Sequence, residues 1–367
     1  MDLSGLITVA QKEFFDHLRS RKFLLIFGIF LVIAIIGMVG GIGEYNDNLD
    51  SYNENQASAS SSPIRGFIAE KPSILSVYSN VATYLVFLGA ILGIAMGFDL
   101  ITREKESKSL KILLSHPVYR DEVINGKALG GILALVVSLA IVLLLSLATL
   151  LIYGIVPDAS ELTMILIFGI VSFLFIFSYF AIALFMSTVS EESGSALIYT
   201  IIIFIILSSL IPMITKDTVM EGIVGSAPDM PQQLIDQMRP GPSDNQSRMD
   251  PGSTARDSTT SETWQKYNTK MQAYLEKRNA IEGILTLFSP TMNYETMVAS
   301  ITSTDDGSDS RGSNRGSFAM SSMRAGEQAV STDDALGKIV NNFLALIIFP
   351  AVFFGLAYVR FMRLDVR

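Results

Sequence analysis

The sequence predicts an all-α integral membrane protein with six transmembrane helices, a helix that precedes the first of them, and a large, partly helical outer loop. Two observations predict this class. Half of the 367 residues are hydrophobic and only 17% are charged, whereas soluble domains carry about 25% charged residues. The hydrophobic residues are also gathered into six long runs. These runs are expected to be helical, because lipid offers no hydrogen-bonding partner to backbone groups.

The apolar runs are long enough to cross the hydrocarbon core, which takes about 20 helical residues; the second is short, but Val77 and Tyr78 extend it upstream. No run has Asp, Glu, Lys, Arg or His in its interior. The runs are residues 23–42, 81–98, 128–152, 162–186, 196–214 and 339–359. Basic residues before the first run resemble the start of a signal peptide. That run is about twice as long as a signal peptide's apolar region and has no cleavage motif after it, so we expect an uncleaved span.

The distribution of lysine and arginine predicts that both termini are cytoplasmic. Basic residues are concentrated before the first run, between the second and third, and after the sixth. The two short segments on the opposite side contain only Arg65 and Lys71, and short basic loops stay in the cytoplasm. In a plasma membrane this orientation divides the chain into four parts. They are a cytoplasmic interfacial helix at 1–22, spans one to five at 23–214 with a loop at 99–127, an extracytoplasmic segment at 215–338, and the sixth span with a cytoplasmic tail at 339–367.

One helix is expected before the first span and another in the outer segment. Apolar residues from Leu3 to Leu18 recur at helical spacing, which predicts an N-terminal interfacial helix on the inner membrane surface. Apolar residues from Trp264 to Phe288 also recur at helical spacing and predict a helix of about seven turns that ends before Pro290. We expect the segment around this second helix to be a small outer domain that packs on itself. The alternative is a surface that contacts a substrate or a partner.

The composition argues against several kinds of chemistry. The chain has no cysteine, and its two histidines, His17 and His116, are far apart in sequence. We therefore expect no catalytic residue, no metal site and no cofactor site. A net charge of −8 argues against nucleic acid as a partner. The Gly-Lys pairs at Gly126 and Gly337 are followed by Ala128 and Ile339, whereas a phosphate-binding loop needs Ser or Thr there, so we expect that the chain has no nucleotide-binding site of its own.

The spans themselves contain hydroxyl and amide side chains but no charge. We interpret most of these groups as partners in hydrogen bonds between helices, and leave open that a few line a substrate path. Carriers driven by protons or ions usually hold titratable residues inside the membrane. An ion-coupled carrier is therefore disfavoured, and energy for transport has to come from a separate subunit such as an ATPase.

Glycine recurs every fourth residue in the second run, at Gly89, Gly93 and Gly97. Small residues at this spacing let two helix backbones approach closely. We favour a tight crossing within one subunit, and a contact between two subunits is the alternative.

The loop at 99–127 has the most informative pattern outside the spans. Charges alternate from Arg103 to Lys108 and an apolar stripe follows, which predicts a helix. Pro117 ends this helix. The stripe consists of Leu110, Leu113 and Leu114. A second helix begins near Asp121 and enters the third run. The stripe favours a helix that docks into a groove of a partner, and the alternative is a solvated loop that only sets the membrane orientation.

This loop resembles the type-2 ABC exporter permeases. In that family an acidic pair follows the second span, then a leucine-rich helix, a Ser-x-Pro-Val-x-Arg turn and a Gly-Lys pair that enters the third span. The matching residues here are Glu104, Glu106, Ser115, Pro117, Val118, Arg120, Gly126 and Lys127. The chain is also similar to the family in its six spans, in the interfacial helix that precedes them and in the Ser289-Pro290 element of the last outer loop. It differs in the outer segment between spans five and six, which is longer than usual.

The resemblance implies a function as the permease subunit of an ATP-binding-cassette transporter. ATP would be bound by a separate ABC ATPase subunit, and a cytoplasmic coupling helix would dock on it. The implied coupling residues are Glu104, Glu106, Leu110, Leu113, Leu114, Pro117, Val118 and Arg120. The other implied partners are membrane lipids and a second permease subunit, either an identical copy or a paralogue. The substrate stays open, and a membrane scaffold or sensor with a large outer domain is the alternative function.

Overall fold

The computed structural model describes residues 3–59, 71–108, 119–232, 235, 253–302 and 332–364. Every regular element within these residues is a helix. The helices are α1 (Leu3–Arg19), α2 (Arg21–Ala59), α3 (Ser76–Gly97), α4 (Thr102–Glu106), α6 (Arg120–Ile152), α7 (Ala159–Val189), α8 (Ser193–Ile205), the π-helix η1 (Ile206–Leu210), α9 (Ile211–Ile214), α10 (Asp217–Val224), α12 (Ser253–Phe288), α13 (Pro290–Thr302) and α14 (Thr332–Met362).

Six helical segments are long and apolar enough to cross a membrane, which confirms the predicted all-α membrane fold. Each overlaps one of the six apolar runs. The segments are Arg21–Glu54, Ser76–Glu106, Arg120–Ile152, Ala159–Val189, Ser193–Ile214 and Val340–Met362. Several extend beyond the apolar runs, because a helix continues into polar flanks once its apolar part has formed.

The chain divides into two compact units. The first unit lies within residues 1–208 and 289–367, and contains all of the long apolar segments except the last turns of the fifth. The second unit lies within residues 209–288 and contains α10 and α12.

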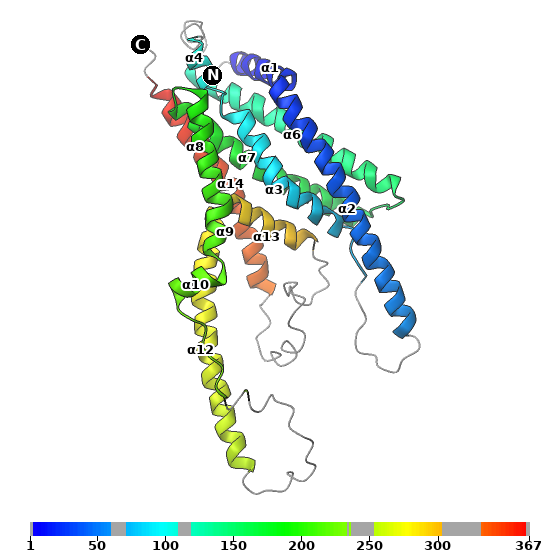
Figure 1. The fold of residues 1–367 in the computed structure, drawn as a ribbon. Coiled ribbons are helices and arrows are strands. Elements are labelled where there is room, and N and C mark those ends of the chain that lie inside the picture. Colours follow the sequence, from blue (N-terminus) through cyan, green and yellow to red (C-terminus); the bar gives the residue numbers. More distant parts are fainter. Residues whose placement is uncertain are drawn as a thin grey trace. The chain divides into compact units, whose positions relative to one another are not determined.

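Helix α7 is the centre of the first unit and packs against both α3 and α14 (Figure 1). Glycines on α3 permit a close approach to α7. A Cβ atom added at Gly93 would lie 2.5 Å from the carbonyl oxygen of Ile176, and one added at Gly97 would lie 2.6 Å from that of Phe180. The structure thus places Gly89, Gly93 and Gly97 against a helix of the same chain.

The predicted helix before the first span is confirmed as α1, and it packs along the beginning of α6 (Figure 1). Glycines again make room for the contact. A Cβ atom at Gly126 would lie 3.0 Å from the carbonyl oxygen of Leu6, and one at Gly130 would lie 2.7 Å from that of Ala10. The apolar face of α1 is therefore turned to α6 and does not lie only on a membrane surface.

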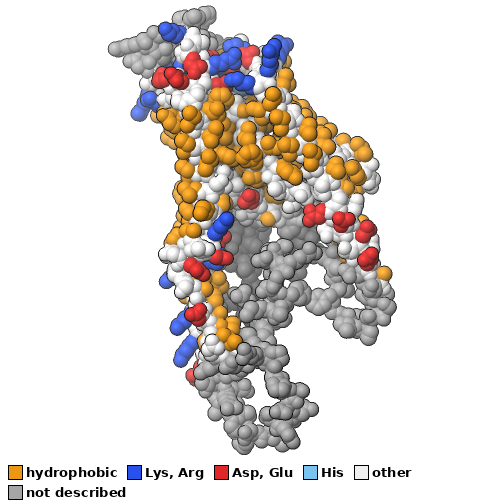
Figure 2. Space-filling model, in the orientation of Figure 1, with side chains coloured by type: hydrophobic (Ala, Val, Ile, Leu, Met, Phe, Trp, Pro, Cys, Tyr) orange, Lys and Arg blue, Asp and Glu red, His pale blue; other side chains and the backbone are white. Residues whose placement is uncertain are grey.

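Hydrophobic side chains cover most of the visible face of the first unit (Figure 2). Lys, Arg, Asp and Glu side chains gather at the end formed by α1 and α4 (Figure 2). Large exposed apolar side chains occur on several long helices, among them Leu25, Leu144, Ile170 and Leu356. An apolar surface of this extent is matched by lipid or by another membrane protein.

Helix α13 has a buried face within the first unit, a feature that the sequence did not predict. It packs against α3, α7 and α14. Its buried residues include Thr291, Tyr294, Met297 and Val298. At 13 residues α13 is too short to cross a bilayer, and this length is typical of a helix that enters the membrane and returns.

The second unit contains the predicted amphipathic helix. It ends at Phe288, before Pro290 as expected, but begins at Ser253, earlier than the first apolar position at Trp264. The additional turns are polar and carry no apolar stripe, so the sequence pattern does not indicate them. Arg278 of α12 pairs with Asp217 of α10 at 2.6 Å, and Met220 of α10 is fully buried.

Candidate functional site at the base of the charged loop

The two ends of the loop at 99–127 lie at the charged end of the first unit (Figure 2). Of the predicted coupling residues, Glu104 and Glu106 lie on α4 and Arg120 begins α6. The remaining ones lie outside the described residues. They are Leu110, Leu113, Leu114, Pro117 and Val118. The structure therefore describes how the loop is attached to the protein, and the predicted docking stripe stays a prediction.

A buried ion triad connects α1, α4 and α6. The Nζ atom of Lys127 lies 2.6 Å from Oε1 of Glu13 and 2.8 Å from Oε1 of Glu104. The Lys127 side chain is only 3% exposed. Charges removed from water are tolerated only when they are paired and hydrogen-bonded, so each of the three helices depends on the other two for its charge balance.

His17 lies one helical turn beyond Glu13 and is close to this triad. Burial lowers the pKa of the His17 imidazole, and the positive charge of Lys127 adds to this effect. The carboxylates of Glu13, Asp99 and Asp16 act in the opposite direction but do not overcome burial. Within the described residues, Nε2 of His17 is buried without a hydrogen-bond partner. The neutral imidazole is therefore the favoured form at this position.

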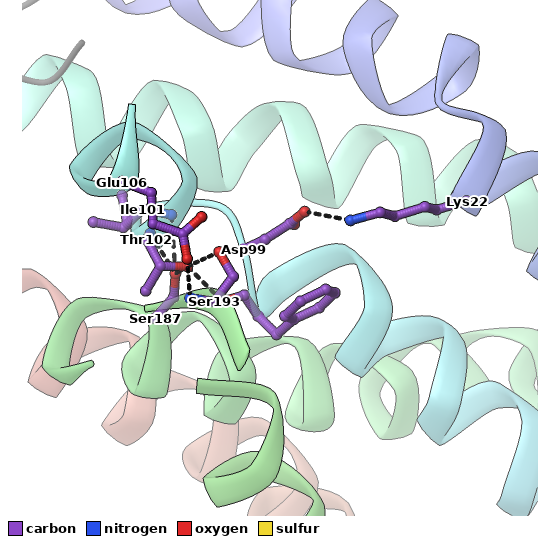
Figure 3. A network of polar contacts seen from close by, with 8 residues as sticks. Lys22, Asp99, Ile101, Thr102, Glu106, Ser187 and Ser193 are labelled. Carbon is purple, nitrogen blue, oxygen red and sulfur yellow. Dashed lines mark hydrogen bonds and ion pairs between the residues drawn. The ribbon is translucent and has the colours of Figure 1, made fainter. Parts of the chain in front are cut away.

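Helix α4 is attached to the adjoining ends of α7 and α8 by hydrogen bonds (Figure 3). The backbone amides of Ile101 and Thr102 donate to Oγ of Ser187 at 2.9 and 3.1 Å. The hydroxyl of Ser193 donates to that of Thr102 at 3.0 Å. Figure 3 shows these side chains converging from α4, α7 and α8. A displacement of α4 would therefore be passed directly to the end of α7.

Two charged residues of α4 complete this attachment by capping helix ends. Nζ of Lys105 donates to the carbonyl oxygens of Thr188 and Ser190 at 2.9 and 2.7 Å. The carboxylate of Glu106 accepts a hydrogen bond from the amide of Ser193 at 2.5 Å. A cation at a helix C-terminus and an anion at a helix N-terminus both stabilise the exposed backbone groups there. Glu106, which the resemblance singled out, thus has a specific structural partner in α8.

The far end of the loop is attached to the sixth span. Nη1 of Arg120 donates a hydrogen bond of 2.7 Å to the carbonyl oxygen of Leu364, just after α14. On the near end, Lys22 at the start of α2 lies 3.4 Å from Asp99 (Figure 3). Both ends of the loop are therefore connected to helices that are distant in sequence.

A hollow of about 760 Å³ lies beside the triad. Its lining mixes positive and negative side chains, among them Arg19, Lys22, Asp99 and Arg103. The described residues contain no cluster of His, Asp and Glu that could hold a metal ion. The polar end of the unit is thus organised by ion pairs and helix caps.

Sequence reasoning did not find the roles of Glu13, His17 and Lys105. The sequence contains a signal for the first two. Leu6, Ala10, Glu13 and His17 follow one another at intervals of three or four residues, so they share one helix face. Two titratable groups on an otherwise apolar face indicate burial with a partner, but only the structure identifies Lys127 as that partner.

The fold and this site define a polytopic membrane protein whose spans are joined to one charged loop. The sequence pattern of the ABC-2 family of transporter proteins matches residues 7–366, and the chain belongs to that family. The chain is 29% identical over 162 residues to "Probable ABC transporter permease protein NosY" of Pseudomonas aeruginosa, a match that covers 44% of this chain and 50% of that protein.

The protein of the same name from Stutzerimonas stutzeri is 28% identical over 136 residues, which are 37% of this chain and 41% of that protein. The chain thus aligns with half or less of the length of these curated relatives. The family is that of ABC transporter membrane proteins, which agrees with the resemblance that the loop at 99–127 carries.

Proposed function

We propose that this chain is the permease subunit of an ABC transporter and exports a substrate across the plasma membrane. ATP would be hydrolysed by a separate ATPase subunit, and both termini would be cytoplasmic. The observation that carries this proposal is the attachment of the charged loop to the other helices. Its two ends contact α1, α2, α7, α8 and the end of α14 through ion pairs and hydrogen bonds. A loop built in this way can pass a displacement to most of the spans.

The coupling mechanism follows from these contacts. An ATPase subunit would press on the segment at 110–120 when it binds ATP. Glu104 and Lys127 would carry the displacement to α1, and Lys105 and Glu106 would carry it to the turn between α7 and α8. Packed helices move as rigid bodies between discrete arrangements and do not bend continuously. The spans would therefore shift together and open a path to the outer side.

A second permease subunit, identical or paralogous, would complete the path. The long apolar helices α2 and α8 support this part of the proposal, because both leave many large apolar side chains exposed. Examples are Val32 and Ile36 on α2, and Ile198 and Ile202 on α8. Membrane lipids would cover the apolar surface that the second subunit leaves free.

Co-expression with an ABC ATPase tests the proposed function. The chain should co-purify with the ATPase from detergent-solubilised membranes, and the complex in lipid nanodiscs should hydrolyse ATP. Glu106→Gln provides a variant in which this contact is weakened but not lost. It removes the negative charge that caps α8, and its side-chain oxygen can still accept the hydrogen bond from the Ser193 amide. A chain that inserts in the membrane but binds no ABC ATPase would instead support the scaffold or sensor function.

A further inference from the structure

Helix α13 is held at a defined depth by hydrogen bonds to α7. The hydroxyl groups of Tyr294 and Ser172 lie 3.1 Å apart, and those of Tyr179 and Thr291 lie 2.9 Å apart. At a rise of about 1.5 Å per residue, Ser172 is about 20 Å from the end of α7 at Ala159. Ser172 is thus close to the middle of α7, which is one of the membrane-spanning helices. The first turns of α13 therefore lie near the middle of the bilayer.

A third bond fixes the beginning of α13. The hydroxyl of Ser289 donates to the carbonyl oxygen of Leu207 at 2.6 Å and accepts from the amide of Met292 at 3.2 Å. Leu207 belongs to the π-helix η1, and π-helical turns leave carbonyl oxygens available to other groups. Three separate hydrogen bonds thus prevent α13 from sliding toward the membrane surface.

Glu295 lies beside these bonds on α13, one helical turn after Thr291. It follows Tyr294 directly, and both Glu295 and Thr296 are exposed, while Tyr294 and Met297 are buried. Within the described part of the chain, the Glu295 carboxylate has no hydrogen bond and no ion pair. The sequence places no charge inside the six apolar runs, but the hydrogen bonds of α13 to α7 bring this residue close to the middle of one of the spans.

A carboxylate at this depth cannot face lipid without a large cost. Ionisable groups inside a membrane almost always face a water-filled cavity or the interior of an assembly, and they mark the paths of ions and substrates. We propose that Glu295 lines the translocation path of this permease and binds the positive charge of an organic cation. This inference rests on the proposed function, because it uses the path between two permease subunits.

The choice of an organic cation follows from the donor set. A small inorganic ion keeps its hydration shell unless several oxygen ligands replace it. The described residues offer no such group of three or more acidic or histidine side chains. A large organic cation has a diffuse charge and a weak hydration shell, so the Glu295 carboxylate and an apolar wall are sufficient to hold it.

Binding of tetraphenylphosphonium, a lipophilic cation of this class, tests the proposal. The complex with its ATPase in nanodiscs should bind the radiolabelled cation, and Glu295→Gln should weaken binding at least tenfold. Asp47→Asn is the matched control, since it removes the same charge from the polar end of α2 beyond the apolar run and should leave binding unchanged. No binding by the native complex, or equal binding by Glu295→Gln, would overturn the proposal.

A second measurement reports water access at Glu295. The chain contains no cysteine, so Glu295→Cys can be labelled without a background. A cationic thiosulfonate reagent should modify this thiol, and tetraphenylphosphonium should protect it. Val298→Cys on the buried face should not react. An unreactive thiol at position 295 would contradict the inferred path.

In each variant, co-purification of the ATPase tests the proposed function separately, so failure of the cation site and failure of the permease assignment give different results.

Discussion

Nζ of Lys127 at the start of α6 lies 2.6 Å from Oε1 of Glu13 on α1, although 114 positions separate the two residues. Glu104 on α4 lies 2.8 Å from the same ammonium group. One buried lysine therefore joins the helix before the first span, the loop after the second span and the beginning of the third. This arrangement explains how a loop of a few turns can be rigidly connected to the membrane-spanning helices.

Removal of the Lys127 charge should strongly destabilise the protein. Lys127→Met leaves Glu13 and Glu104 as unpaired buried carboxylates, which costs about 3–5 kcal/mol. The Tm in detergent should fall accordingly. Lys22→Met is the control, because Lys22 is 72% exposed at its contact with Asp99 and surface ion pairs contribute about 1 kcal/mol or less. The triple variant with Glu13→Gln and Glu104→Gln should recover part of the Tm, and an equally low value would contradict this account.

Acidic substitutions in the apolar stripe should uncouple the ATPase. We expect Leu113→Asp with Leu114→Asp to leave the protein in the membrane, because these residues lie outside the six spans. The variant should lose ATP hydrolysis that depends on the permease, since a charged stripe cannot enter an apolar groove. Ser109→Asp adds a charge to the same segment outside the stripe and serves as the control. Unchanged hydrolysis by the double variant would count against a docking helix.

Acidification should destabilise the charged end of the first unit. Burial lowers the pKa of His17 below its usual 6.5, against the opposing carboxylates of Glu13, Asp16 and Asp99 and with the help of Lys127. A group whose folded-state pKa is lowered contributes stability that is complete above the unfolded pKa and is lost as the pH falls toward the folded value. The Tm should therefore decrease below pH 6.5. His17→Gln should reduce this decrease, and an identical pH profile would contradict the assignment to His17.

Substitution of alanine for a glycine of α3 should destabilise the protein where that glycine contacts the backbone of α7. A Cβ atom at Gly97 would lie 2.6 Å from the carbonyl oxygen of Phe180, so Gly97→Ala forces α3 away from α7 at a cost of about 1–3 kcal/mol. Gly40→Ala on α2 has no atom within 4 Å of the new Cβ and should be neutral or slightly stabilising. Thermal unfolding of the two variants in detergent provides the comparison. An equal Tm for both would show that the crossing is looser than these distances indicate.

Periodicity and length were sufficient to predict the helices that are long and apolar. The six spans and α1 follow from these signals alone, because burial of a helix in lipid or against a neighbour needs a continuous apolar stripe. Helix α13 was not predicted. Its buried face includes Thr291, Asn293 and Tyr294, and polar side chains of this kind give no apolar stripe even when each of them is buried.

The candidate site could be predicted only in part. The charges of the loop were visible in the sequence, and the resemblance singled out Glu104 and Glu106. The partners were not visible, because Ser193 is 87 positions from Glu106 and Leu364 is 244 positions from Arg120. Contacts at such separations depend on how the spans are arranged, and one sequence without its fold contains no direct record of that arrangement.

The sequence by itself determined that the chain is a membrane protein with six helical spans and a charged loop between the second and third. These features follow from the free energy of transferring side chains from water to lipid, which each residue contributes independently of distant ones. Only the tertiary structure decided that Lys127 binds Glu13 and Glu104, and that α13, which carries Glu295, is hydrogen-bonded to α7. Both depend on the packing of helices from distant parts of the chain, which composition and periodicity do not specify.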